Sequence, residues 1–138
     1  MKASILTSTL LELLNPASAA VKSNALYTEV ILSADTSLSI RVLDNSFSFA
    51  DTRPAVVYQP GAFLLGQSDE AGKTLLAVRD FVATLDPDAR CDLSVEADEN
   101  KLKLRLQQGK VTARFTVKRE TAEPVQQPAQ DVFRVRVN

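Results

Sequence analysis

The feature that most constrains this chain is an internal repeat. Residues 33–42 read SADTSLSIRV, and residues 96–106 read EADENKLKLRL. Each passage is an Ala-Asp turn, a small polar pair and a strand in which apolar and polar residues alternate, and each lies downstream of a leucine-rich helical pattern. A unit of helix plus strands that recurs after about 63 residues predicts a duplicated, pseudo-symmetric domain.

The first half of the chain has the pattern of a strand, a helix and three strands. We expect Thr7 or Ser8 to cap the helix, whose apolar positions are leucines. Asn15-Pro16 is expected to end it, because the residue before a proline avoids the helical region, and Lys22 then lies in a loop. The expected strands lie at residues 2–6, 26–33, 38–42 and 47–49, with a turn at 44–46.

The second half repeats this order after some extra strand material at residues 56–58 and 62–65. Ser68 is the expected N-cap of a second helix, which Asp86-Pro87-Asp88 ends. Its apolar positions, spaced by three and four, are Leu75, Val78, Val82 and Leu85, with Phe81 beside them. Three alternating strands follow, which carry Leu93 and Val95, then Leu102, Leu104 and Leu106, then Val111, Ala113, Phe115 and Val117.

These patterns predict a single α+β domain, a size that suits a chain of 138 residues. We expect the domain to cover residues 1–119, with pseudo-repeats at about 1–53 and 54–119. Residues 120–131, with two prolines and three glutamines, have the composition of a linker. Residues 132–138 then form one more alternating strand, which is expected to begin a following domain or to be lent to a neighbour.

Charge is unevenly distributed along the chain. Residues 1–100 carry 7 basic and 14 acidic side chains, whereas residues 101–138 carry 9 basic and 3 acidic ones. Such asymmetry is found in proteins that bind polyanions. Because the basic residues alternate with apolar ones along strands, a solvated sheet face is the simpler interpretation.

The residues needed for common catalytic and metal sites are mostly absent. The chain has no histidine and one cysteine, Cys91, which excludes Ser-His and Cys-His nucleophiles, His-ligated zinc and CxxC sites. The stretch Gly66–Thr74 follows a strand and opens a helix as a phosphate-binding P-loop does. It has five residues, rather than four, before Gly72-Lys73-Thr74, and two of them are acidic. We therefore expect no enzymatic activity, no metal and no cofactor, with a nucleotide-binding enzyme as a remote alternative.

The sequence also bears on location. A single cysteine fits a reducing cytosol. No apolar run approaches the about 20 residues of a membrane span, and polar residues interrupt the N-terminal leucines too often for a signal peptide. We expect a cytoplasmic protein without membrane association.

In order and spacing, these segments resemble the N-terminal domain of the bacterial-type DNA polymerase III β sliding clamp. The likeness begins with Met1-Lys2, a strand and the helix TSTLLELL, and continues through residues 25–49, with Leu43-Asp44 in place of the usual Thr-Asp turn. The motif Gln59-Pro60-Gly61, the helix AVRDFVATL and the strands DLSVEADENKLKLRLQQGKVTARFTV follow in the same order. The resemblance covers about residues 1–118, with a longer segment than usual between Gly61 and Thr74.

The resemblance implies a DNA-clamp fold, in which a βαβββ unit is duplicated and two helices pack on antiparallel sheets. In the family, helices line a hole around duplex DNA, sheets form the outer wall, and three such domains per chain dimerise head to tail. The implied function is that of a processivity factor, which is not an enzyme. DNA polymerase and clamp loader would be bound through missing or neighbouring domains. A stand-alone clamp-like module that binds replisome proteins is the alternative.

The resemblance also assigns residues. Lys22, Lys73 and Arg79 would contact duplex DNA without regard to its sequence. The basic cluster of Lys101, Lys103 and Arg105 lies on a strand, and hence on the outer wall. The edge strand of the domain would pair with the neighbouring subunit when the ring assembles. The residues assigned to this subunit interface are Lys110, Thr112, Arg114, Phe115 and Val117.

Overall fold

The two halves of the chain form one α+β unit in the computed structural model, which describes residues 1–23, 29–43, 48–67 and 69–119. The elements are β1 (Lys2–Leu6), α1 (Thr7–Ser23), β2 (Glu29–Ala34), β3 (Leu38–Leu43), β4 (Ser48–Arg53), β5 (Val56–Gln59), β6 (Gly61–Gln67), α2 (Asp69–Ala83), β7 (Arg90–Asp98), β8 (Lys101–Gln108) and β9 (Val111–Arg119). The expected βαβββ order is confirmed in both halves, with β5 as the additional strand. The turn predicted at 44–46 and the linker and strand predicted over 120–138 lie outside the described residues.

The strands form one nine-stranded antiparallel sheet in the order β4-β3-β2-β6-β9-β8-β7-β1-β5. The two halves exchange their first strands. Strand β1 pairs with β7, where Ile5 lies opposite Cys91, and β6 pairs with β2, where Leu32 lies opposite Phe63. Each half therefore completes the sheet of the other.

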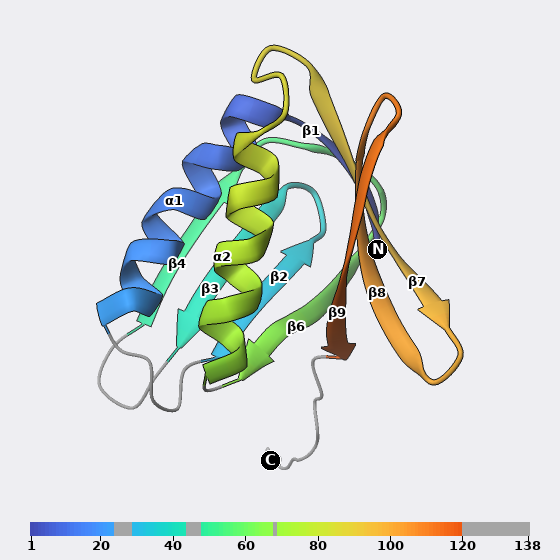
Figure 1. Ribbon diagram of the computed structural model, residues 1–138. Coiled ribbons are helices and arrows are strands. Elements are labelled where there is room, and N and C mark those ends of the chain that lie inside the picture. Colours follow the sequence, from blue (N-terminus) through green and yellow to red (C-terminus); the bar gives the residue numbers. More distant parts are fainter. Residues whose placement is uncertain (24–28, 44–47, 68, 120–138) are drawn as a thin grey trace, which may run out of the picture.

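Both helices lie side by side on one face of this curved sheet (Figure 1). Their buried residues meet the inward residues of β2, β3, β7 and β8 in one core. The alternation read from the sequence is confirmed, because Leu38, Ile40 and Val42 are buried on β3, and Leu104 and Leu106 on β8. The members of this core that α1 and α2 supply include Leu10, Leu13, Leu14, Ala17, Val21, Leu75, Val78 and Val82.

The first helix is longer than the sequence predicts. Pro16 lies inside it, and α1 runs on to Ser23, so Lys22 belongs to a helix and not to a loop. Proline in a helix interior removes one backbone hydrogen bond, at a cost of about 3 kcal/mol. The Pro16 ring is exposed, while Ala17 and Val21 in the continuation are buried. Core packing therefore outweighs the local preference against the helix.

The start of α1 also differs from the expected side-chain cap. The backbone N–H groups of Thr7 and Ser8 donate to the carbonyls of Ala89 (3.0 Å) and Pro87 (3.1 Å), in the turn after α2. The hydroxyl of Thr7 instead accepts a hydrogen bond from Gln108 Nε2 (2.9 Å). The second half of the chain therefore supplies the acceptors that this helix end needs.

Candidate DNA-facing helices, strand edges and outer sheet face

The helix surface that faces away from the sheet carries two of the three residues predicted to contact DNA. Lys73 is exposed on α2. Arg79 is half-buried on the same helix, and its Nη2 lies 3.0 Å from Asp80 Oδ1. Lys22 lies in the last turn of α1, and its side chain is outside the described part of the structure. The structure thus brings Lys73 and Arg79 to one helix, as the sequence predicts, and their role toward DNA stays a prediction.

The charge of this helix surface is not basic in the described residues. The acidic side chains described on the two helices are Glu12, Glu70 and Asp80, and the basic ones are Lys73 and Arg79. Glu12 and Glu70 lie beside strand cations, at 3.3 Å from Arg53 and 3.8 Å from Lys118. Asp80 directly neutralises Arg79. Phosphate binding without sequence preference needs a net excess of lysine and arginine, so this surface alone is a weak site for duplex DNA.

Strand β9 has a free edge, as the assignment of a subunit interface requires. It pairs with β8 from Val111 to Val117, but with β6 only at Lys118 and Arg119. Along residues 111–117 the backbone on the other side has no strand partner in the described part of the chain. Such an edge can add a strand from another molecule.

The predicted interface residues divide between two faces of β9. Lys110 lies exposed in the turn before the strand, and Thr112 and Arg114 lie on the side away from the helices. Phe115 and Val117, predicted as apolar contacts to the neighbour, point inward instead. The Phe115 ring packs edge-on against the Phe81 ring, with the two ring centroids 6.3 Å apart, and Val117 is only 3% exposed. Their burial leaves the backbone and the polar side chains for an interface, whose existence stays a prediction.

A second free edge, which the sequence reasoning missed, lies at β4. This strand ends the sheet and pairs only with β3 among the described residues. The repeat itself could have revealed it, because β4 occupies the same place in the first half as β9 does in the second. The register between β3 and β4 matches that between β8 and β9 at an offset of 64 residues: Ser39 opposes Thr52, and Lys103 opposes Thr116.

The basic cluster lies on the sheet face opposite the helices, as expected for an outer wall. We call this surface, formed by β1, β5, β7, β8 and β9, the outer face. Glu96 lies 3.8 Å from Arg105 Nη1 and 3.7 Å from Arg114 Nε, and so neutralises one of two opposed cations. Lys103 Nζ donates to Thr116 Oγ1 at 2.8 Å. The basic side chains described on this face are Lys2, Arg90, Lys101, Lys103, Arg105 and Arg114, against the acids Asp92 and Glu96.

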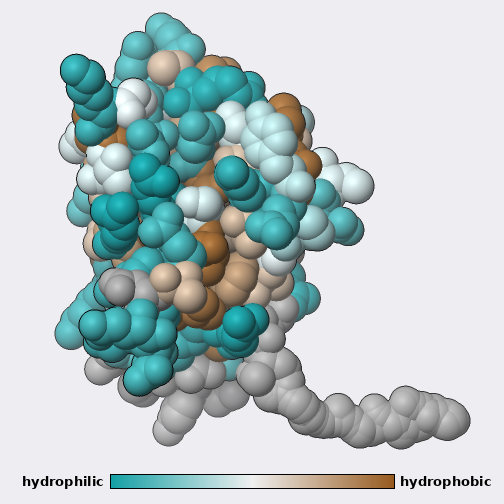
Figure 2. All heavy atoms as spheres, turned by 90° about the vertical axis from the view of Figure 1, so that its right-hand side faces the viewer, coloured by the Kyte–Doolittle hydropathy of each residue, from teal (hydrophilic) through white to brown (hydrophobic). Residues whose placement is uncertain are grey.

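Figure 2 shows the side of the molecule on which β7, β8 and β9 lie. It is largely hydrophilic, interrupted by an apolar strip. One groove of about 550 Å³ lies between the β7–β8 turn and the end of β9, where it is lined by Ala97, Leu102, Val117 and Arg119 among others. The outer face is thus charged, and the groove lies at one end of the sheet, where the inward-pointing Val117 contributes to its lining.

The near P-loop does not form a phosphate cradle. Gly66 and Gln67 belong to β6, and Gly72, Lys73 and Thr74 lie within α2, which begins at Asp69. A P-loop needs those last three residues at the end of a loop, where backbone N–H groups point at phosphates. The neighbours of β6 are antiparallel, unlike the sheet around such loops. The nucleotide-binding alternative is therefore wrong for this segment.

Three further observations concern metal binding, the cysteine and membrane crossing. In the described residues, no three His, Cys, Asp or Glu side chains lie close enough together to hold a metal ion. Burial raises the pKa of the Cys91 thiol to about 11, since the charged thiolate is poorly solvated there. Within the same residues, neither helix is long and apolar enough to cross a membrane.

No protein-family model matches this sequence, and no curated protein matches it significantly. Among solved structures, the chain is similar to the β sliding clamp of Caulobacter crescentus, with a TM-score of 0.71 and 22% identity over 95% of this chain and 33% of that one. It is also similar to the DNA polymerase III subunit beta of Pseudomonas aeruginosa, with a TM-score of 0.65 and 16% identity over 94% of this chain and 33% of that one. The chain spans about one third of the length of these structures. Its fold is therefore that of one domain of a bacterial β sliding clamp.

Proposed function

We propose that this chain serves as a domain of a DNA sliding clamp, a ring that encircles duplex DNA and tethers the replicative polymerase. The observation that carries the proposal is the likeness of fold over 95% of the chain. The ring and the tethered polymerase belong to this proposal, as do a clamp loader bound through other domains and a cytoplasmic location.

The free edges of β4 and β9 support assembly into a ring. A head-to-tail ring needs two different surfaces that fit each other on every unit. Strands β4 and β9 supply such a pair, because each ends a three-stranded meander and occupies the same place in its half. If β9 of one unit adds to β4 of the next, the sheet continues from unit to unit and the helices all face the same side.

Cross-linking between these edges tests the assembly. The double variant Ala50→Cys, Thr112→Cys puts one thiol on β4 and one on β9, and a short thiol cross-linker should give a ladder of oligomers. Cys91 is buried and should not react. The matched control, Ala50→Cys with Lys73→Cys, places the second thiol on α2 and should give no ladder. A ladder from the control, or none from the test pair, would contradict β4–β9 pairing.

Topology tests encirclement itself. A cross-linked ring should remain on circular duplex DNA through a wash at high salt, because its hold does not depend on phosphate contacts. It should slide off once the circle is cut. Equal loss from circular and linear DNA in the same salt would show ordinary electrostatic binding instead.

A stand-alone module that binds replisome proteins is a second candidate. The observation that favours it is the weak basic charge of the helix surface, where Asp80 neutralises Arg79 and leaves Lys73 as the other described cation. A cross-linked β4–β9 oligomer that is not retained on circular DNA would support this candidate over the DNA ring.

A further inference from the structure

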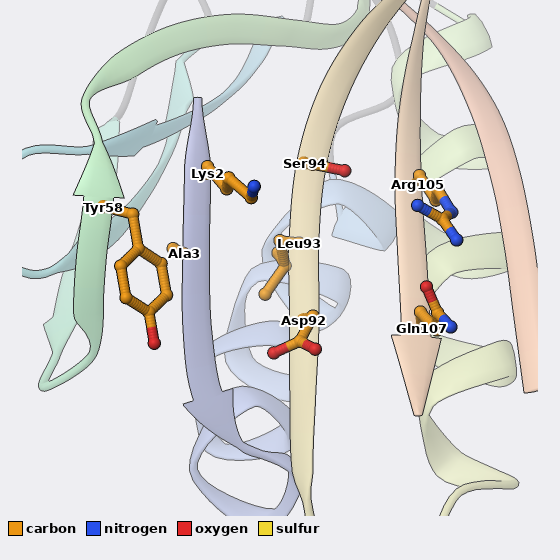
Figure 3. A pocket seen from close by; sticks show the side chains of 8 residues that line it. All are labelled: Lys2, Ala3, Tyr58, Asp92, Leu93, Ser94, Arg105 and Gln107. Atoms are coloured by element: carbon orange, nitrogen blue, oxygen red, sulfur yellow. The ribbon is translucent and has the colours of Figure 1, made fainter. Parts of the chain in front are cut away.

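We propose that the outer face of the sheet binds single-stranded nucleic acid, in addition to any duplex inside a ring. The inference begins with a pocket of about 260 Å³ on this face (Figure 3). Enclosed sites for whole small molecules usually measure about 300–1,000 Å³. The smaller, open pocket therefore suits one part of a longer ligand. Its lining residues are Lys2, Ala3, Tyr58, Asp92, Leu93, Ser94, Arg105 and Gln107.

The pocket lies where a row of cations crosses four strands. Lys2 opposes Ser94, Ser94 opposes Arg105, and Arg105 opposes Arg114. Directly opposed residues point to the same side of a sheet, so all four side chains share the outer face. Ser94 is the smallest of them, and it leaves a depression between Lys2 and Arg105. An anion over Ser94 would meet an ammonium, a hydroxyl and a guanidinium.

Arg105 can donate further hydrogen bonds. Within the described part of the chain, its one ion pair is to Glu96, at 3.8 Å, and Glu96 also lies 3.7 Å from Arg114. Its Nε is buried and has no hydrogen-bond partner in the described structure. A buried donor without an acceptor is unfavourable by about 1–3 kcal/mol, so a phosphate oxygen that draws the guanidinium to itself would relieve this position.

The neighbouring row of residues suits a base rather than a phosphate. Tyr58 is 68% exposed on the edge strand β5. Its ring lies at one margin of the pocket, and β1 separates it from Asp92 on β7 and Gln107 on β8 (Figure 3). Exposed aromatic rings beside basic grooves are the platforms on which bases of single strands stack. A carboxylate repels phosphate but accepts hydrogen bonds from base amino groups, and an amide can do either. The two rows thus separate a backbone side from a base side.

The cations continue beyond the pocket. Lys101, Lys103 and Arg105 alternate along β8, so their side chains recur about every 6.6 Å on one face. Duplex DNA hides the faces of its bases, whereas a single strand offers them to Tyr58. Among polyanions, a single strand therefore uses both the ring and the cations, while an acidic peptide uses the cations alone.

Fluorescence anisotropy with a labelled oligothymidylate of about 15 nucleotides tests the proposal on the full chain. The chain should bind it at about 50 mM salt and release it as salt rises. Tyr58→Ala should weaken binding by about 5- to 150-fold, and Tyr58→Phe should not, because it keeps the ring. Lys2→Gln should lower the slope of log affinity against log salt by about 0.7.

Arg41→Gln, at an exposed cation on β3 in the other half of the sheet, is the matched control and should leave this binding unchanged. Tyr58 is exposed, so its variants should keep the wild-type melting temperature, which excludes misfolding as the cause. The proposal is overturned if the oligonucleotide does not bind, or if Tyr58→Ala binds as the wild type does. It is also overturned if polyglutamate displaces the strand as well as unlabelled oligothymidylate does, since the face is then a site for acidic peptides.

Discussion

The two halves of the molecule share a backbone fold, but different interactions hold their last strands against the helices. In the first half, Arg53 on β4 binds Asp51 (3.1 Å) and Glu12 on α1 (3.3 Å). In the second half, Phe115 on β9, which matches Asp51 at the offset of 64 residues, packs against Phe81 on α2. One edge strand is therefore held to its helix by one partly exposed ion pair, and the other by an aromatic contact. The comparison shows that strand register can be kept while the interactions that support it are exchanged.

The inward positions of β3 and β8 provide the strongest test of equivalence. Ile40 and Leu104 occupy matching positions and are 0% and 1% exposed. Ile40→Ala and Leu104→Ala should each lower the free energy of unfolding by about 2–5 kcal/mol, through lost burial and a cavity. Urea denaturation measures both values. A loss below about 1 kcal/mol for one of them would show that the two halves do not share one core.

The aromatic contact should be worth more than its ionic counterpart. Phe115 is half-buried, so Phe115→Ala should lower the free energy of unfolding by about 2–3 kcal/mol, less than the about 3–5 kcal/mol of a fully buried phenylalanine. Phe115→Leu serves as the control and should recover most of the loss. Thermal unfolding measures the melting temperature of both variants. A melting temperature of Phe115→Ala equal to that of the wild type would refute the comparison.

The buried thiol makes the stability of the second half depend on pH. The pKa of Cys91 rises from 9.0 to about 11 in the folded chain, so the folded state holds its proton longer than the unfolded state does. The resulting stability is full below about pH 9 and is lost as pH rises toward 11, by up to about 2–3 kcal/mol. Cys91→Ala should flatten that part of the stability curve. Equal curves for both proteins between these pH values would contradict the assignment.

The helices differ in a way that engineering can remove. Pro16 lies inside α1, whereas α2 has no proline. Gly72 of α2 lies so close to α1 that a Cβ atom placed on it would be 3.0 Å from Val21 Cγ1. Pro16→Ala should restore a helix hydrogen bond and raise the free energy of unfolding by about 1–2 kcal/mol. Ala19→Pro, at another exposed position of α1, is the opposing control and should destabilise the protein. A lower melting temperature for Pro16→Ala would show that the proline fits this helix.

The smallest effect is expected for the ion pairs of the first half. Arg53→Ala should lower the free energy of unfolding by only about 0.2–1 kcal/mol, because the groups involved are partly exposed. High salt should reduce the difference between variant and wild type. If the loss equalled that of Phe115→Ala and persisted in salt, the ion pairs and the aromatic contact would stabilise the protein equally. The contrast between the halves would then be wrong.

Periodic features of the sequence were sufficient to predict the fold class and most elements. The spacing of Leu75, Val78 and Val82 predicted the buried face of α2, and the alternation around Ile40 and Leu104 predicted two inward strand faces. These signals are local, so a single sequence carries them. Pro16 was misread because the burial that overrides its local preference depends on the sheet beneath it.

The candidate sites were harder to predict, because they depend on pairing between distant strands. Lys73 and Arg79 could be placed on one helix from their spacing. The inward direction of Val117 and the free edge of β4 follow from the sheet order, which the sequence does not state. The row from Lys2 to Arg114 joins residues from three separate strands with Ser94 between them, and no motif marks it.

The exchange of first strands between the halves has a consequence for how the chain folds. Strand β1 cannot form its pairing with β7 until β7 exists, and Lys2 lies 92 positions before its partner Ser94. During synthesis, the first half therefore leaves the ribosome before β7 has been made. Until then, the apolar side of its sheet is exposed to solvent. Contacts so distant in sequence slow folding. The same arrangement means that a cut between the halves would yield two fragments that regain structure only by finding each other.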